Sequence, residues 1–334
     1  MLPEIDILEN DILEKYPDVL EILLRDHTTK QNIFWATDNY EELGNKYHFS
    51  SQIFPELITG KNGHIIMPRV KKDKELQQTR VREMAEVFTP SWICNAQNNL
   101  IDNAWFRSEN VFNTEIITKN GTKSWKINEQ KITFPDGKSW KHYVRDTRLE
   151  IACGEAPYIT SRYDTTTGKF IPIAKRIGLL DRKLRVINEN VDDSGEWLEA
   201  AQTAYKNIYA FEWQGDSLLL AREAMLISFI ENYKFKFNKE PLLKSIQYIA
   251  YIISWNVWQM DGLKGVVPNS CGNKITETQN LFGETETSVS ACEGCAKDNI
   301  KKHNGIYCLI KDWDKKEIKT GKKGTKIKFV DLIK

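Results

Sequence analysis

The stretch that most constrains the fold is residues 147–158, TRLEIACGEAPY. Leu149 and Ile151 alternate with charged or small neighbours, which predicts a short β-strand. Small residues follow, among them Cys153 and Gly154, and they leave room for the chain to turn sharply. Doubly wound α/β proteins place a nucleotide-like ligand at the turn that follows such a strand.

One more strand is expected after this turn, followed by a helix and then by a buried segment that is either helix or strand. Residues 207–213 (NIYAFEW) read as a strand, and apolar residues then recur at helical spacing from Leu218 to Ile230. Residues 246–257 are typical of a buried helix or strand, and they lead to Asp261. This alternation predicts an α/β fold with a mainly parallel sheet and helical crossovers.

Composition indicates a soluble globular protein. The chain has 334 residues, of which 41% are hydrophobic and 28% charged, and this length allows one large domain or two smaller ones. No apolar run reaches the roughly 18 residues that span a bilayer, and the acidic N-terminal stretch lacks the features of a signal peptide. Six cysteines do not make a disulfide scaffold in a chain of this length. We therefore expect a cytoplasmic location and no membrane partner.

The patterns divide the chain into three regions. Residues 1–80 are expected to be mostly helical, and residues 81–270 to form the α/β domain, with an insertion at about 108–145. Residues 271–334 form an extension rich in Cys and Lys, in which 272–290 are expected to be a loop.

Charge is balanced over the whole chain and uneven along it. Lys and Arg (47) nearly equal Asp and Glu (46), so the total charge does not predict a polyanionic partner. From Ala296 onward, however, twelve lysines stand against five acidic residues, a net charge of +7. Such a segment is typical both of a nucleic-acid-binding surface and of a solubilising tail, and the sequence leaves both interpretations open.

A group of cysteines in the extension suggests a metal site. Cys292 and Cys295 form a C-x2-C pair around a glycine, which is a half-site for tetrahedral Zn²⁺. Cys308, with Cys271 or His303, can complete it. The expected ligand set is Cys271, Cys292, Cys295 and Cys308. The alternative is that these are free thiols near a loop.

The order of several short motifs resembles one known family. The string EVFTP at 86–90 precedes the Ala-Cys-Gly turn, a strand ending in Glu212 follows it, and Asp261-Gly-Leu comes later. Over about residues 80–265, this series resembles the N6-adenine DNA methyltransferases, in particular the modification subunits of type I and type IIG restriction–modification systems. The resemblance implies a Rossmann-like fold that binds S-adenosylmethionine (SAM).

The resemblance also implies a set of SAM-binding residues. By this resemblance, Thr89 and Pro90 would lie near the methionine part of SAM. Glu212 would accept hydrogen bonds from the ribose hydroxyls. Asp261 would bind the adenine amino group, and Asp216 is an alternative for that role. The residues expected to bind the cofactor are Phe88, Thr89, Pro90, Glu150, Cys153, Gly154, Glu212 and Asp261.

The sequence departs from the family in two places. It has no two adjacent prolines, so it lacks the Asn/Asp-Pro-Pro-Tyr/Phe tetrapeptide that holds the flipped adenine. Glu155 and Ala156 stand where the family has Ser-Gly. No catalytic residue is therefore assigned. We expect a SAM-binding subunit of a DNA adenine methyltransferase, with a partner chain supplying the catalytic segment and target recognition. The alternative is an inactive DNA- or protein-binding module on the same scaffold that modulates restriction.

Overall fold

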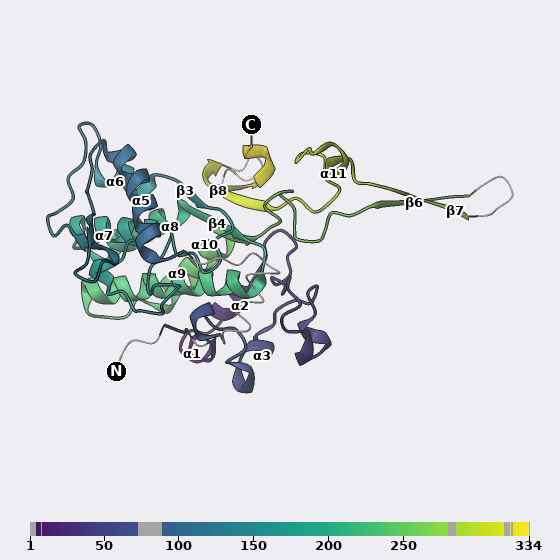
Figure 1. Ribbon diagram of the computed structural model, residues 1–334, viewed down its shortest axis with the longest axis horizontal. Coiled ribbons are helices and arrows are strands. Elements are labelled where there is room, and N and C mark those ends of the chain that lie inside the picture. The colour runs from purple at the N-terminus through teal and green to yellow at the C-terminus, as the bar shows by residue number, and fades with distance from the viewer. Residues whose placement is uncertain are drawn as a thin grey trace.

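Three short parallel strands form the central sheet of the protein, in the order β3-β4-β5 (Figure 1). They are β3 (Arg148–Glu150), β4 (Ile208–Glu212) and β5 (Val257–Gln259). The computed structural model describes residues 5–7, 9–72, 89–279, 285–316, 321 and 323–333. β3 lies within the stretch 147–158 and β4 within the stretch 207–213, as the sequence predicts.

Helices join these strands. β3 is linked to β4 through the short turn η5 (Ile173–Lys175), α7 (Leu179–Asn190) and α8 (Ser194–Lys206). β4 is linked to β5 through α9 (Gly215–Phe237) and α10 (Leu243–Asn256). Parallel neighbours need crossovers of this kind, and the predicted α/β class is confirmed. Residues 246–257, for which both helix and strand were open, are mostly helix.

The two faces of the sheet pack differently, because successive residues of a strand point to opposite faces. Ile208, Ala210 and Val257 belong to the main core, which the helices share. Phe211 and Trp258 point the other way and belong to a second, smaller apolar cluster. That second cluster is completed by residues of the C-terminal extension.

Helix α9 lies within the main core and is buried on almost all sides. Its first residue is Gly215, where a β-carbon would collide with the backbone oxygen of Phe34. Only glycine therefore lets the N-terminal region come this close to the start of the helix. Although α9 has 23 residues, neither it nor any other helix in the described ranges is long and apolar enough to cross a membrane.

The N-terminal region is helical only in short pieces. Its described part contains α1 (Glu9–Lys15), α2 (Val19–Leu24), α3 (Pro55–Ile58) and the 3-10 turns η1 (Glu41–Leu43), η2 (Asn45–Tyr47), η3 (Gly60–Asn62) and η4 (Arg69–Lys71). Pro17 separates the first two helices, since proline interrupts the hydrogen bonds of a continuous helix.

Arg222 of α9 fastens this region to the sheet. Its guanidinium is fully buried and donates to the carbonyl oxygens of Val257 (2.8 Å), Arg25 (3.1 Å) and Ser254 (3.3 Å), and also to that of Leu23. These oxygens belong to the start of β5, the end of α10 and the end of α2. One side chain therefore satisfies backbone acceptors from three elements that are far apart in the sequence.

The insertion at 108–145 carries a small hairpin and a helix. They are β1 (Asn113–Ile117), β2 (Lys123–Ile127) and α6 (Trp140–Arg145), and they follow α5 (Ser91–Phe106). α5 is held by a buried polar network, in which Arg182 of α7 donates to Asp102 (2.6 Å), Asn99 (2.8 Å) and Asn95 (3.0 Å). Because every partner in this network is polar and buried, the network fixes how α5 sits on α7.

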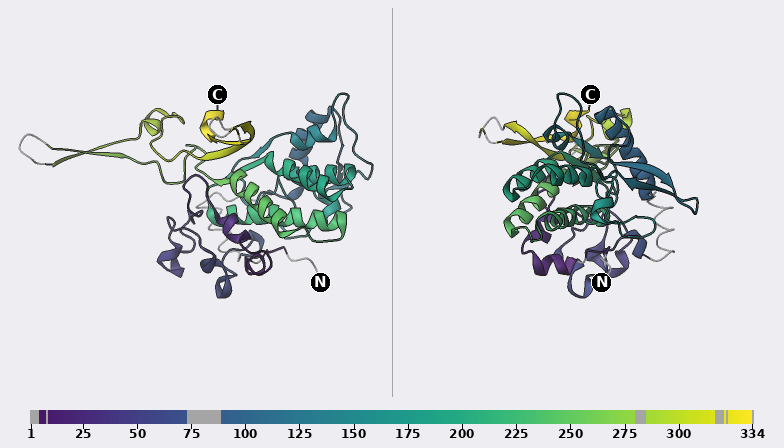
Figure 2. Two further views of the ribbon diagram at one scale, coloured as in Figure 1. Left: turned by 180° about the vertical axis from the view of Figure 1, so that it is seen from behind. Right: turned by 90° about the vertical axis from the view of Figure 1, so that its left-hand side faces the viewer.

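The C-terminal extension consists of two hairpins and a short helix. They are β6 (Lys274–Gln279) with β7 (Thr285–Ser290), α11 (Glu293–Lys297), and β8 (Leu309–Lys316) with β9 (Lys323–Lys328), followed by η6 (Phe329–Leu332). The first hairpin projects far from the body (Figures 1 and 2). The prediction of a loop at 272–290 is therefore wrong. The Thr- and Ser-rich strands of this hairpin are exposed on both faces, so they lack the alternation that marks a half-buried strand.

Replacing Arg222 with Met is expected to lower the free energy of unfolding by about 3 kcal/mol or more, because it leaves several buried carbonyl oxygens without a donor. Urea denaturation followed by circular dichroism measures the change. Arg107→Met, at an exposed position, is the matched control. A loss of less than about 1 kcal/mol for the Arg222 variant would show that the carbonyl oxygens find other partners.

Candidate cofactor and metal sites

The carboxyl ends of β3, β4 and β5 meet at one edge of the sheet. The N–H of Cys153 donates to the carbonyl oxygen of Phe211 (3.0 Å), and the N–H of Gly154 donates to Oε2 of Glu212 (2.8 Å). On the other side, the N–H of Met260 donates to the carbonyl oxygen of Glu212 (2.9 Å). Glu212 thus lies between the turn after β3 and the residues that lead to Asp261.

The turn after β3 has a strained backbone. Ala152, Gly154 and Ala156 have φ angles of 48°, 53° and 56°. Glycine adopts this left-handed conformation freely, whereas each alanine pays roughly 1–2 kcal/mol for it. Backbone strain of this kind clusters at ligand-binding sites. It also lets two successive N–H groups, those of Cys153 and Gly154, reach the end of β4.

Two acidic side chains are buried at this edge. Burial raises the pKa of Glu150 well above its usual range, although the N–H groups of Tyr158 and Ile159 oppose the shift and the charge of Glu212 adds to it. Burial also raises the pKa of Glu212, against the hydrogen bonds from Gly154 and from the residues that follow Glu212. Oε2 of Glu150 is buried without a hydrogen-bond partner within the described ranges. The edge can therefore accept hydrogen bonds from a polar ligand.

The other two acids implied by the resemblance have partners of their own. Oδ1 of Asp261 accepts from the N–H groups of Leu263 (3.0 Å) and Lys264 (3.1 Å), and so stabilises the turn after β5. Asp216 is fully buried, accepts from the Tyr40 hydroxyl (2.7 Å), and lies 3.4 Å from Nζ of Lys72. Asp261 is therefore at the edge with Glu212, whereas Asp216 faces the N-terminal region.

Thr89 and Pro90 lie at the start of α5, and Phe88 lies outside the described residues. The carbonyl oxygen of Thr89 accepts from Oγ1 of Thr165 (3.1 Å). Burial raises the pKa of the Tyr158 hydroxyl, and a hydrogen bond with Thr89 opposes that shift. Thr89 is thus joined to the loop that follows the strained turn.

Asp164, which the sequence did not indicate as a site residue, joins the loop after the strained turn to the start of α5. One carboxylate oxygen of Asp164 accepts from the N–H of Ser91 (2.8 Å), and the other from the N–H groups of Thr166 (3.0 Å) and Thr167 (2.8 Å). The string Asp-Thr-Thr-Thr-Gly is typical of such an Asp-centred turn and offered a signal. Nothing in the sequence pairs it with Ser91.

Four side chains of the extension form a compact ligand cluster, Cys271, Cys292, Cys295 and His303. Their ligand atoms all lie within 4.8 Å of one another. The sulfurs of Cys271 and Cys295 are 3.7 Å apart, and Nδ1 of His303 lies 3.5–3.7 Å from the three sulfurs. Zn–S bonds of about 2.3 Å in a tetrahedron put sulfurs about 3.8 Å apart. This cluster can hold a metal ion such as zinc.

The structure corrects the fourth expected ligand. Cys308 is fully buried in the second apolar cluster, where its Sγ lies 3.4 Å from the carbonyl oxygen of Gln259. His303, the alternative left open by the sequence, takes its place. The reason is backbone pairing: Cys308 immediately precedes β8, which packs on the body, while His303 folds back over α11. A β-carbon at Gly294 would collide with His303, so this approach requires glycine.

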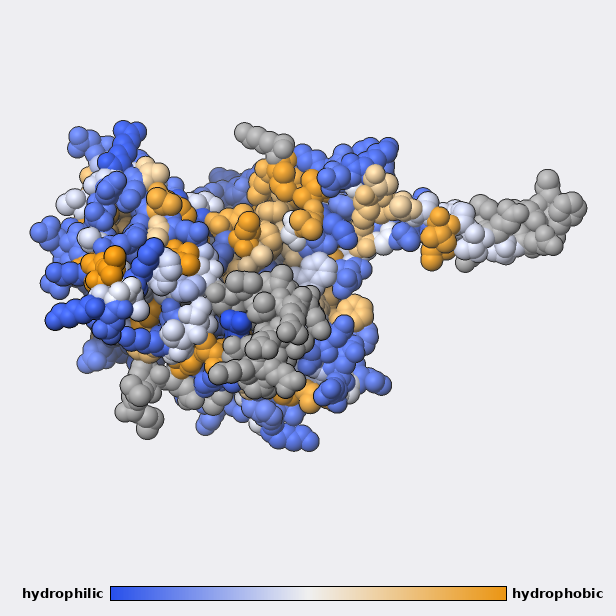
Figure 3. Space-filling model, viewed as in Figure 1, coloured by the Kyte–Doolittle hydropathy of each residue, from blue (hydrophilic) through white to orange (hydrophobic). Residues whose placement is uncertain are grey.

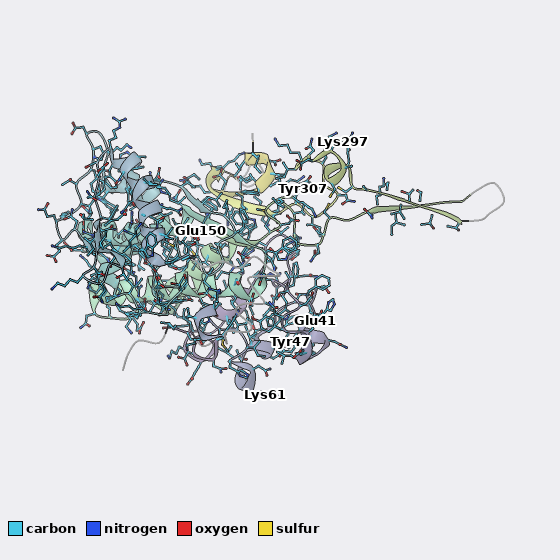
Figure 4. All side chains as sticks on the ribbon, viewed as in Figure 1. Glu41, Tyr47, Lys61, Glu150, Lys297 and Tyr307 are labelled. Carbon is cyan, nitrogen blue, oxygen red and sulfur yellow. The ribbon has the colours of Figure 1, made fainter. Side chains whose placement is uncertain are left out.

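The environment of Cys292 favours the thiolate that binds metals. Burial raises the pKa of this thiol, but hydrogen bonds from the N–H groups of Cys295 and Asn304, together with the contact to His303, lower it to about 6. A thiol with this pKa is largely ionised at neutral pH, and the ionised form is the metal ligand. Figure 4 shows Glu150 in the body and Lys297 and Tyr307 on the extension, so the two sites are separate.

Comparison with the profiles of known protein families, with curated protein sequences and with solved structures finds no match for this chain. Two features of the described residues bear on its function, the acidic edge of the sheet and the Cys3His cluster.

Glu150→Gln is expected to make the protein more stable than the native chain at alkaline pH. Because the folded-state pKa of Glu150 lies above its ordinary value of 4.5, the stability that goes with the protonated form is complete below that value and is lost as the pH rises through the folded-state pKa. Gln keeps the neutral form at every pH.

Urea denaturation of both proteins at about pH 5 and pH 8 measures this difference. The advantage of the variant should grow with pH, while Glu109→Gln, at an exposed site, should behave as the native chain at both. An advantage that does not change with pH would mean that Glu150 is not held in its neutral form.

Proposed function

We propose that this protein is a SAM-binding subunit of an N6-adenine DNA methyltransferase of a restriction–modification system, and that it works with a partner chain. The observation that carries the proposal is the hydrogen bond from the Gly154 N–H to Glu212. It joins the strained turn after one parallel strand to the acid at the end of the next. In an open α/β sheet, ligands bind outside the carboxyl ends of such strands.

The acidic edge suits the cofactor. Glu212 has two carboxylate oxygens, each with one backbone donor, and each retains a lone pair for a ribose hydroxyl. The partnerless oxygen of Glu150 can accept a hydrogen bond from the amino group of the methionine part. Oδ2 of Asp261 lies 3.5 Å from Nζ of Lys264 and retains a lone pair for the adenine amino group. The bound sulfonium supplies the methyl group. The residues of this chain would bind and orient that cofactor.

Two observations support a partner chain. β3 is an outer strand of the described sheet. Leu149 in β3 and Ile151 directly after it are exposed, to 45% and 68%. Parallel sheets normally have both faces covered. Figure 3 shows further hydrophobic residues over the C-terminal elements near this region. A second chain that covers β3 would also lie beside Gly154, where the catalytic tetrapeptide is needed.

The second candidate function is an inactive module that binds DNA or protein and modulates restriction. The absence of two adjacent prolines from the sequence favours it, because the tetrapeptide holds the flipped base. A methylation assay on duplex DNA, with and without the product of the neighbouring gene, distinguishes the two. Transfer only in the presence of that product supports the split enzyme.

We propose in addition that the Cys3His cluster binds a structural zinc ion. All four positions of a tetrahedron are filled by protein ligands, which is typical of structural rather than catalytic zinc. The ion would tie the base of the β6–β7 hairpin to α11, since Cys271 precedes the hairpin and Cys292 follows it.

Calorimetric titration with SAM and with its demethylated product tests the cofactor site. We expect binding by the native chain, and a loss of about tenfold or more for Glu212→Gln, because one hydrogen bond to a charged group contributes about 1.5–3 kcal/mol. Glu42→Gln, at an exposed position, should bind normally. Absence of binding at millimolar ligand would overturn the proposal.

Metal analysis of the purified protein tests the zinc site. About one zinc per chain is expected, falling below about 0.2 in Cys295→Ser because a thiolate ligand is lost. Cys308→Ser is the matched control and should keep its zinc. Equal zinc in both variants, or none in the native chain, would contradict the assignment.

A further inference from the structure

A cavity lies against the face of the sheet that packs on the C-terminal extension, where Leu149, Tyr209 and Trp258 of the three strands line it. Its volume is about 660 Å³, within the usual range for small-molecule sites. It opens beside Thr147 and Asn207, which immediately precede β3 and β4. The β8–β9 hairpin and helices α8 and α10 supply most of the remaining walls. Because none of the residues proposed to bind SAM lines this cavity, the proposed SAM site does not account for it.

The walls are rich in aromatic rings held in fixed positions. Nε1 of Trp313 donates to Oδ1 of Asn256 (2.8 Å), and the Tyr209 hydroxyl donates to the carbonyl oxygen of Lys311 (3.0 Å). Rings fixed in this way need little ordering when a planar ligand stacks on them. The aromatic residues that line the cavity are Tyr209, Tyr248, Tyr251, Trp258, Trp313 and Phe329.

Four cations converge on the same cavity, Arg145, Lys206, Lys311 and Lys323. None of them forms an ion pair within the part of the chain that the structure describes. Two acids, Asp312 and Asp314, also line the cavity, which leaves a net positive charge. An anionic ligand would therefore find cations that are not already neutralised.

The cations and the rings are interleaved. Nζ of Lys206 lies 5.3 Å from the ring centre of Tyr248 and 5.5 Å from that of Trp313. Nζ of Lys311 lies 4.5 Å from the ring centre of Trp313 and donates to the Tyr251 hydroxyl (3.0 Å). A ligand that joins a planar ring to a negative group a few ångströms away matches this arrangement.

We propose that this cavity binds a nucleotide, either free or as part of a single strand. The base packs against the aromatic walls at Trp313 and Tyr248, and the phosphate lies near Lys206 and Arg145. Proteins that bind single strands without base readout combine aromatic platforms with a cationic groove in the same way. The inference goes beyond the proposed methyl transfer and does not depend on SAM binding.

The test is fluorescence anisotropy with a labelled oligothymidylate of five nucleotides, with dAMP as the competitor. Affinity should fall as salt rises, because phosphate contacts release counterions. Trp313→Ala should weaken binding at least about fivefold, since stacking of one base contributes about 1–3 kcal/mol. Lys206→Glu should weaken binding and make it less dependent on salt.

Lys61→Glu, an exposed lysine of the N-terminal region (Figure 4), is the matched control and should bind as the native chain. Thermal melts confirm folding, and Lys206→Glu keeps the inference testable should Trp313→Ala prove unstable. Competition by dAMP assigns the site to a mononucleotide, and binding of the oligonucleotide alone assigns it to a strand. The inference is overturned if neither dAMP nor the oligonucleotide binds, or if SAM displaces the oligonucleotide. It is also overturned if Lys61→Glu weakens binding as much as Lys206→Glu does.

Discussion

The buried guanidinium of Arg222 is the interaction on which the described fold depends. It donates to backbone carbonyl oxygens at the end of α2, at the end of α10 and at the start of β5, so it sets where the N-terminal region, the last crossover and the third strand lie relative to one another. Burial lowers the pKa of Arg222 to about 10, and the group stays charged at neutral pH. This buried cation is tolerated because the dipoles of the carbonyl groups surround it and the charge of Asp26 acts in its favour.

The position of Glu212 follows from this arrangement. β4 pairs with β3 on one side and with β5 on the other, and Arg222 fixes β5 by binding its first carbonyl oxygen. The N–H of Gly154 then reaches Glu212 from one side and Met260 approaches from the other. The register of the three strands thus brings the acidic side chains together. The backbone strain at this edge lies in the turn, where Ala152 and Ala156 have positive φ angles. The metal cluster is independent of this geometry, because its four ligands all come from the extension.

Much of the fold and of the two candidate sites was predictable from the sequence, and the features that were not predicted have physical causes. Alternation and helical spacing predicted β4 and α9, since those patterns reflect burial directly. The C-x2-C pair predicted two ligands of the cluster, because Cys292 and Cys295 are three residues apart along one turn. The choice between Cys308 and His303 was not predictable, because it depends on the pairing of β8 with the body. The β6–β7 hairpin was not predicted because its strands bury neither face. The Asp164–Ser91 contact was not predicted because it joins residues that are far apart in the sequence.

The exposed side chains of Leu149 in β3 and of Ile151, which follows β3, limit how the proposed partner chain binds. Covering Leu149 and Ile151 contributes on the order of 1–2 kcal/mol each, which falls short of the cost of immobilising a partner. A stable complex therefore needs more surface than β3 provides. The β6–β7 hairpin extends from the body (Figure 2), and it exposes Ile275 and Val289, which face each other across its two strands. An isolated two-stranded hairpin is marginally stable on its own, so a partner that contacts both β3 and this hairpin would stabilise the hairpin. The Cys3His cluster at its base, with the proposed metal ion bound, would then reduce the ordering cost of binding.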